Sequence, residues 1–107
     1  MGPKREFFRI ALDRSGTLRR GHEAAACEVL DLTEKGVQLK TDFPVTVGET
    51  LECDFSLTET RAIHCSIRVT RVSASSVGAC VIDISPANQE KLSRFIDEVI
   101  ALNLGGF

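Results

Sequence analysis

Alternating apolar and polar residues run through most of the chain, and this period-two pattern is typical of half-buried β-strands. The clearest alternation lies at residues 51–57, where Leu, Cys, Phe and Leu face one way and Glu, Asp and Ser the other. Turn-forming residues separate such stretches at intervals of roughly 10–15 residues, which favours an antiparallel barrel or sandwich over a βαβ repeat. The expected strands lie at residues 7–12, 24–31, 37–40, 51–57, 63–72 and 77–84.

Three local features refine this pattern. Polar residues and a glycine at Arg14–Gly16 predict a turn directly after the first extended stretch. In the fifth stretch the apolar phase slips at Thr70–Val72, which predicts a β-bulge or a sharp bend, as strands need when they curl around a small barrel. In the last stretch, Cys80, Ile82 and Ile84 are expected to share one face.

The C-terminal part of the chain changes to a helical period. Ser85 suits an N-cap and Pro86 suits the first helical position, where its missing N–H costs nothing. The apolar residues at positions 92, 95, 96, 99 and 100 then form one stripe. A helix over residues 86–102 is therefore expected to pack on the barrel. The alternative is that the same stripe also binds a partner protein or a second copy of the chain.

Length and composition indicate one globular domain. The 107 residues include 43% hydrophobic and 26% charged side chains, which is normal for a chain that buries a single core. No apolar run is long enough to span a bilayer and the N-terminus lacks the apolar stretch of a signal peptide, so we expect a cytoplasmic protein without membrane insertion. The four cysteines have no CxxC spacing and are expected to be small buried hydrophobes, with a disulfide, a metal site or a reactive thiol less favoured.

Charge is distributed unevenly along the chain. Residues 1–20 hold six basic and two acidic side chains, a net charge of +4, whereas residues 21–107 hold seven basic and thirteen acidic ones, a net charge of −6. A basic segment on an acidic body suits either an anionic ligand or docking of the segment on the body. The acidic body disfavours a long nucleic acid, which needs a broad positive track.

Sequence motifs for catalysis are missing. Neither type of Gly-rich phosphate loop is present, and His22 and His64 have no nucleophile or metal ligand at a diagnostic spacing. The chain has no Trp or Tyr, so no aromatic platform for single-stranded nucleic acid is evident. These observations predict a protein that is not an enzyme and binds no nucleic acid polymer.

Two short elements offer ligand chemistry. Arg5 and Arg9 lie four residues apart, and guanidinium groups bind phosphates bidentately, hydrogen-bond the O6/N7 edge of guanine and stack on purines. Asp31 and Thr33 would project from one face of an extended segment, and Gly36 would permit either a positive φ or a close backbone approach. Each element alone also fits a purely structural role, as solvated arginines and as a turn that closes a hairpin.

Together and in this order, the two elements resemble the motifs of PilZ domains, bacterial receptors for cyclic di-GMP. The family pattern is RxxxR followed later by [DN]x[SA]xxG. Here the first motif reads Arg5-Glu6-Phe7-Phe8-Arg9, and after 21 residues the second reads Asp31-Leu32-Thr33-Glu34-Lys35-Gly36. The segment Val77–Ile84, followed by Ser85-Pro86 and the terminal helix, is similar too, so the resemblance covers about residues 4–102.

The resemblance implies a mainly β fold in a single domain, residues 1–107. Its parts would be a flexible basic arm at residues 1–9, a six-stranded antiparallel barrel at residues 10–84 and a C-terminal helix at residues 86–102. The arm would fold over bound ligand.

The resemblance also implies a ligand-binding set. Arg5 and Arg9 would hold the phosphates and guanine edges of cyclic di-GMP, Asp31 and Thr33 would hydrogen-bond a guanine, and Gly36 would shape the turn beneath it. Lys4, where many relatives have another arginine, is a secondary candidate. Most relatives have serine where this chain has Thr33, which keeps the hydroxyl but adds a methyl group and a stiffer χ1. No metal and no cofactor besides the ligand is expected.

The sequence therefore predicts a bacterial second-messenger receptor that orders its arm on binding cyclic di-GMP and signals to an unidentified effector protein, as a monomer or a weak homodimer. The alternative is a PilZ-like adaptor that binds no nucleotide and acts by protein–protein interaction. Retention of Arg5, Arg9, Asp31 and Gly36 favours the receptor. A small barrel that binds RNA or DNA fits the arginines but not the acidic body.

Overall fold

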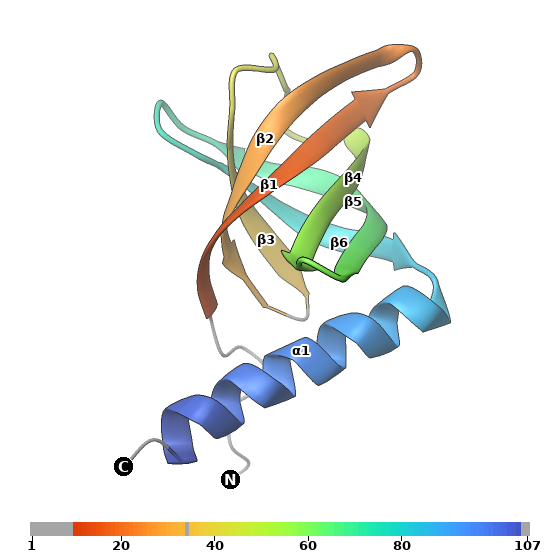
Figure 1. The fold of residues 1–107 in the computed structure, drawn as a ribbon. Helices are drawn as coiled ribbons and strands as arrows, with labels where there is room; N and C mark the ends of the chain where they lie inside the picture. The colour runs from red at the N-terminus through yellow and green to blue at the C-terminus, as the bar shows by residue number, and fades with distance from the viewer. Residues whose placement is uncertain (1–9, 34, 106–107) are drawn as a thin grey trace, which may run out of the picture.

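The fold is a closed antiparallel barrel with one helix, seen in a computed structural model that describes residues 10–33 and 35–105 (Figure 1). The strands follow one another around the barrel in the order β1-β2-β3-β6-β5-β4. The elements are β1 (Ile10–Arg20), β2 (Glu23–Leu32), β3 (Gly36–Thr41), β4 (Thr50–Thr58), β5 (Arg61–Val72), β6 (Val77–Ile84) and α1 (Pro86–Gly105). The expected mainly β architecture, six antiparallel strands with a C-terminal helix, is confirmed.

Inward-facing apolar side chains fill the barrel. The alternation of apolar and polar residues explains this filling, as strand β4 shows. Its apolar residues Leu51, Cys53, Phe55 and Leu57 are all buried, whereas the residues between them are not. Within the described part of the chain, no polar or charged residue is buried. A ligand site on these residues therefore has to lie on the outer surface or at an end of the barrel.

Helix α1 lies across one end of the barrel and packs on it through Leu92, Phe95 and Ile96, which are buried (Figure 1). The predicted cap is present, because the Ser85 hydroxyl accepts a hydrogen bond from the backbone N–H of Asn88 at 3.2 Å. Among residues 10–33 and 35–105, no helix has both the length and the apolar character needed to cross a bilayer.

An ion pair holds the second half of the helix to the barrel. Arg61, at the start of β5, donates two hydrogen bonds to the carboxylate of Glu98, at 3.0 and 3.1 Å. This contact raises the pKa of Arg61 and lowers the pKa of Glu98. The helix continues to Gly105, three residues beyond its predicted end.

The predicted turn at Arg14–Gly16 is wrong, because β1 runs through it. Gly16 lies where β1 is paired on both sides, with β2 and with β4. A Cβ atom at this position would lie 2.6 Å from the carbonyl oxygen of Asp54 and 3.1 Å from Sγ of Cys27. Glycine is therefore required for close strand approach where the barrel closes, and not for a change of chain direction.

The predicted bulge near Thr70 is confirmed. Val69 pairs with Ala79, and the next pair is Arg71 with Gly78, so Thr70 is the extra residue on β5. The bulge turns the side chain of Arg71 to the outer face of the barrel, where it is exposed.

The predicted common face of Cys80, Ile82 and Ile84 is wrong. Val77 and Ala79 are buried instead, and Ile82 is 40% exposed. The reason is a second bulge, since β6 pairs through residues 81 and 83 with consecutive residues of β5 and Ile82 is the extra residue. A one-residue slip exchanges the two faces of a strand, and after it Ile84 packs against the core again.

The four cysteines are free thiols, and three of them, Cys27, Cys53 and Cys65, are buried as predicted, whereas Cys80 is only partly buried. The neighbouring thiols of Cys27 and Cys65, together with burial, raise the pKa of Cys53 far above its ordinary value. Cys53 is therefore a protonated core side chain, as expected for a small buried hydrophobe.

Candidate functional site

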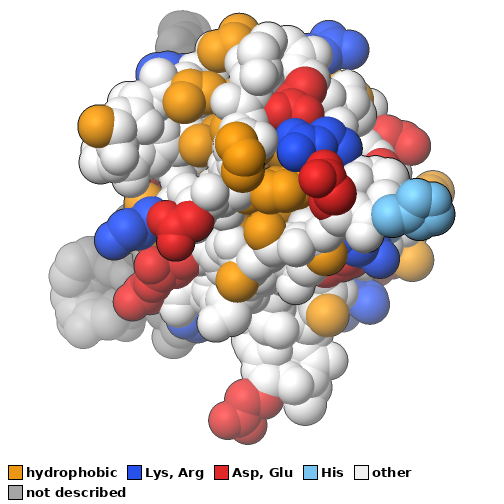
Figure 2. All heavy atoms as spheres, turned by 90° about the horizontal axis from the view of Figure 1, so that it is seen from above, with side chains coloured by type: hydrophobic (Ala, Val, Ile, Leu, Met, Phe, Trp, Pro, Cys, Tyr) orange, Lys and Arg blue, Asp and Glu red, His pale blue; other side chains and the backbone are white. Residues whose placement is uncertain are grey.

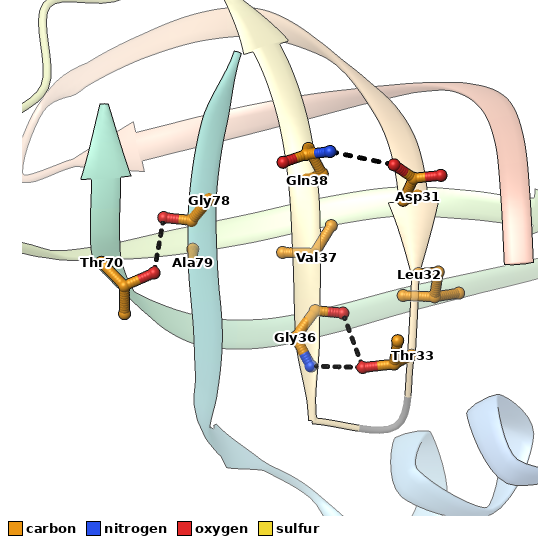
Figure 3. A pocket seen from close by; sticks show the side chains of 9 residues that line it. All are labelled: Asp31, Leu32, Thr33, Gly36, Val37, Gln38, Thr70, Gly78 and Ala79. Atoms are coloured by element: carbon orange, nitrogen blue, oxygen red, sulfur yellow. Dashed lines mark hydrogen bonds between the residues drawn. The ribbon is translucent and has the colours of Figure 1, made fainter. Parts of the chain in front are cut away.

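A solvent-open pocket of roughly 200 Å³ lies on the outer wall of the barrel, at the end nearer to helix α1 (Figure 3). It is formed where the β2–β3 turn meets β6 and the bulged end of β5. The three defining positions of the second sequence motif, Asp31, Thr33 and Gly36, are among its lining residues. The lining residues are Asp31, Leu32, Thr33, Gly36, Val37, Gln38, Thr70, Gly78 and Ala79.

Asp31 presents its carboxylate to this pocket from the end of β2. A bulge precedes it, because Val29 pairs with Leu39 and the next pair is Asp31 with Gln38, which leaves Leu30 unpaired. The Gln38 side-chain amide donates a hydrogen bond from Nε2 to Asp31 Oδ2 at 3.0 Å. The carboxylate is therefore held on the outer face by a neighbouring strand.

Thr33 organises the turn that follows β2. Its hydroxyl oxygen accepts hydrogen bonds from the backbone N–H groups of Lys35 at 3.1 Å and Gly36 at 3.0 Å. Both acceptor positions of the hydroxyl are thereby used, while its proton has only a long contact of 3.4 Å with the Gly36 carbonyl. Thr33 thus retains the ability to donate one hydrogen bond into the pocket.

Gly36 is needed for close approach of two strands. The sequence suggests two reasons for a glycine here, a positive φ or a close backbone approach. Gly36 does not have a positive φ, since among the described glycines only Gly21 and Gly48 have one. A Cβ atom at position 36 would lie 3.0 Å from the carbonyl oxygen of Ala79. The missing side chain lets β3 lie close to β6 beside the pocket.

The sequence-predicted basic residues Lys4, Arg5 and Arg9 lie outside the described residues. The described chain begins with Ile10, which pairs with Leu32, and Ala11 then pairs with Asp31. The start of β1 is therefore adjacent to the pocket-lining end of β2.

Gln38, Thr70 and Gly78 line the pocket but were not singled out from the sequence. Gln38 is part of an alternating strand pattern, and its polar face carried no distinguishing signal. The slip at Thr70 did mark a bulge, but nothing local to β5 shows that the bulge adjoins the β2–β3 turn.

His64 lies elsewhere, in an exposed cluster of polar and charged side chains on β1, β4 and β5. Its Nδ1 is 2.6 Å from Asp54 and its Nε2 is 2.9 Å from Glu52, and Arg19 also pairs with Asp54 at 2.6 Å. No group of three or more His, Cys, Asp or Glu side chains suited to a metal ion occurs in the described residues. Both ring nitrogens of His64 are therefore engaged with carboxylates on the barrel surface.

The barrel closely matches several solved structures, although sequence identities are low. The chain superposes on the Bacillus subtilis inhibitor of motility (MotI/DgrA) with a TM-score of 0.77 at 17% identity, covering 96% of this chain and 52% of that one. For YcgR of Escherichia coli in complex with c-di-GMP, the TM-score is 0.78 at 14% identity, covering 96% of this chain and 49% of that one. The chain thus spans about half the length of these two proteins.

An isolated domain gives a match over nearly the full length of both chains. The PilZ domain of YcgR with c-di-GMP, also from Escherichia coli, has a TM-score of 0.74 at 14% identity, covering 97% of this chain and 98% of that one. A search of curated protein sequences finds no match. The family model of the PilZ domain matches residues 3–98, which include both motifs. The chain therefore belongs to the PilZ domain family.

Proposed function

We propose that this protein is a receptor for cyclic di-GMP that acts without catalysis. The observation that carries the proposal is the pocket itself, because Asp31, Thr33 and Gly36 of the second motif line one open site on the barrel wall. The start of β1 adjoins this site, and Arg9 directly precedes it in the sequence. Two structural neighbours that contain c-di-GMP support the choice of ligand.

Asp31 would recognise a guanine base. A carboxylate accepts hydrogen bonds, and the Watson–Crick edge of guanine offers N–H donors, whereas adenine has no ring N–H there. Among the described residues Asp31 Oδ2 accepts from Gln38, and Oδ1 has no hydrogen-bond partner. One oxygen would therefore hold the carboxylate in place while the other receives the base.

Thr33 would contribute as a donor, since its acceptor positions are filled by the turn. Its proton would move from the long contact with the Gly36 carbonyl to an acceptor of the ligand. Arg5 and Arg9, with Lys4 as a secondary contact, would bind the phosphates and the guanine edges that accept hydrogen bonds.

Signalling would follow from neutralisation of the basic arm at residues 1–9. Ligand phosphates would compensate the arginine charges, order the arm against the barrel and so present a changed surface to an effector protein. We propose a monomer or a weak homodimer as the acting species.

Calorimetric titration of cyclic di-GMP into the purified protein tests the proposal. We expect a micromolar or tighter Kd for the wild type, no measurable binding for Arg9→Ala and at least about tenfold weaker binding for Asp31→Ala. Arg94→Ala is the matched control, because Arg94 is exposed on α1 and pairs only with Glu90 among the described residues. Its Kd should equal that of the wild type.

The absence of binding heat in a folded wild-type protein would contradict the receptor proposal. The second candidate, an adaptor that binds protein and no nucleotide, would then lead. One observation favours it specifically: the Thr33 hydroxyl already serves the turn, so this motif residue has a structural task without any ligand. A pull-down with the wild type and with a variant of the exposed helix surface, Arg94→Glu, would then test whether α1 binds the partner.

A further inference from the structure

Four residues form one straight row across the outer wall of the barrel. Asp31 of β2 pairs with Gln38 of β3, Gln38 pairs with Gly78 of β6, and Gly78 pairs with Arg71 of β5. They are distant in the sequence, but the barrel order β2-β3-β6-β5 makes them direct neighbours. The row therefore connects the Asp31 carboxylate in the pocket to the guanidinium group of Arg71, which lies two strands beyond Gln38.

Two bulges produce this alignment. The unpaired residues are Leu30 on β2 and Thr70 on β5, and each directly precedes a member of the row. A one-residue slip reverses the side of the sheet to which a side chain points. The bulges thus bring Asp31 and Arg71 to the same outer face and into register with Gln38.

The absence of a side chain at Gly78 makes room for Arg71. A Cβ atom at position 78 would lie 3.3 Å from Nη2 of Arg71 and 3.5 Å from both its Cβ and its Nε. The arginine therefore lies flat across the glycine on the barrel wall. In this position its guanidinium reaches the side chain of Gln38 on the far side of β6.

The hydrogen bonds along the row run in one direction. Arg71 has only donors, and its Nη2 donates to Oε1 of Gln38. This contact orients the Gln38 amide with its NH2 group toward Asp31, where Nε2 donates to Oδ2 at 3.0 Å (Figure 3). An amide has one acceptor end and one donor end. Because Arg71 binds the acceptor end of Gln38, the donor end is the one that faces Asp31.

We propose that Gln38 and Arg71 are positioning residues for Asp31, which hold its carboxylate in the orientation that receives guanine. The inference rests on the proposed function and deepens it, since neither residue belongs to the two motifs. Preorganisation of a ligand-binding group increases affinity because less ordering remains to be done on binding. Loss of either contact should therefore weaken binding without removing any of the groups proposed to touch the ligand.

The first measurement needs no ligand. In ¹H–¹⁵N spectra, the side-chain NH2 signals of Gln38 are identified by their loss in Gln38→Leu. We expect these signals to shift in Asp31→Ala and in Arg71→Ala, and to stay in place in Lys40→Ala, a change on the same strand and outside the row. Unchanged Gln38 signals in both row variants would overturn the positioning role.

The second measurement is a double-mutant cycle on the Kd for cyclic di-GMP. Gln38→Leu should weaken binding about tenfold in the wild-type background and have almost no effect in Asp31→Ala, because a positioning residue has nothing left to position. In Thr33→Ser the same change should again cost about tenfold. Gln89→Leu is the matched control, since the Gln89 amide bonds Ser93 within helix α1.

The outcomes separate this proposal from the receptor proposal. Equal effects of Gln38→Leu with and without Asp31 would overturn the positioning role while leaving the receptor intact. If the wild type binds no cyclic di-GMP, the receptor proposal is wrong, and the amide spectra alone decide whether Gln38 and Arg71 hold Asp31. Arg71→Lys, which keeps a donor, should retain more affinity than Arg71→Ala.

Discussion

Thr33 illustrates how one side chain serves both the fold and the proposed site. Its hydroxyl satisfies two backbone N–H groups of the β2–β3 turn, of Lys35 and Gly36, and so fixes the segment that lines the pocket. Serine would supply the same hydroxyl without the methyl group. The residue therefore stabilises the turn whether or not a ligand is bound.

Thr33→Val tests this local role, because it keeps the shape and removes the hydroxyl. Two backbone donors lose their acceptor, so we expect the free energy of unfolding to fall by about 1–2 kcal/mol, measured by urea denaturation. Thr33→Ser is the control and should remain within about 0.5 kcal/mol of the wild type. Equal stability of Thr33→Val and the wild type would show that solvent replaces these hydrogen bonds.

At the scale of single elements, β1 determines how the barrel closes. It pairs with β2 along most of its length, but its described pairs with β4 extend only from Gly16 to Arg19. Gly16 is the first residue of these pairs, which form a short seam, and a Cβ atom there would lie only 2.6 Å from the carbonyl oxygen of Asp54. Closure of the barrel between β1 and β4 therefore depends on the absence of a side chain at Gly16.

Gly16→Ala should be among the most damaging small substitutions in the described chain. Its new Cβ would meet the Asp54 carbonyl at 2.6 Å, and a backbone atom cannot yield without opening the seam. We expect a loss of about 2–3 kcal/mol in the free energy of unfolding by urea denaturation. Gly21→Ala is the control: that glycine has φ of 60° and open space around it, so only backbone strain of about 1 kcal/mol applies. Equal losses in the two variants would contradict the crowding at the seam.

The attachment of helix α1 should be sensitive to acid. Hydrogen bonds from Arg61 lower the pKa of Glu98 below its ordinary value of 4.5. A carboxyl whose pKa is lowered on folding stabilises the folded state above its unfolded pKa, and this stabilisation is lost as the pH falls through the folded pKa. The ion pair should therefore hold at neutral pH and weaken below about pH 4.5.

Urea denaturation between about pH 3 and pH 7 measures this effect. The free energy of unfolding of the wild type should fall more steeply on the acid side than that of Glu98→Gln. In the Arg61→Ala background the same substitution should change the profile much less, because the main cause of the lowered pKa of Glu98 has been removed and only the weaker attraction of Arg94 remains. Parallel profiles for all variants would show that the pair contributes nothing measurable in solution.

Across the whole molecule, the two ends of the barrel have different character. Helix α1 covers one end (Figure 1), whereas the other end exposes hydrophobic side chains beside a basic group flanked by acidic ones (Figure 2). Arg20 lies there over the ring of Phe43, 4.4 Å from its centroid, and pairs with Glu23 and Glu49, each at 3.0 Å. These contacts link the β1–β2 hairpin to the loop before β4.

Ligand binding should stabilise the whole barrel by mass action. At a hundredfold excess of cyclic di-GMP over its Kd, the free energy of unfolding should increase by about 2.7 kcal/mol and Tm should rise accordingly. Cyclic di-AMP at the same concentration should give a smaller shift, because Asp31 would meet a base without a ring N–H on that edge. Equal thermal shifts with both nucleotides would argue against recognition of guanine by Asp31.

Much of the architecture follows from local sequence pattern alone. The alternation at residues 51–57 correctly marked β4, the slip at Thr70 marked a real bulge, and Ser85 and Pro86 marked the start of α1. These signals are readable because each depends on neighbours within a few residues. The motif residues Asp31, Thr33 and Gly36 were likewise recognised from a short segment, and the structure brings them into one pocket.

Other features depend on contacts between distant strands. Gly16 looked like part of a turn, because nothing near it in the sequence reveals that Asp54 and Cys27 would crowd a side chain there. The inward face of β6 was misassigned because the bulge at Ile82 is defined only by pairing with β5. A bulge without a visible break in alternation is decided by the partner strand, and only the tertiary structure contains that partner.

The same division applies to the proposed site. Local pattern is enough to find the strand periodicity, the helix start, the family motifs and the residue types able to bind phosphate and guanine. The register of Gln38 and Arg71 with Asp31 is visible only in the folded barrel, because their alignment depends on barrel order and on two bulges. Composition and spacing specify which side chains are present, whereas strand register specifies which of them share a face.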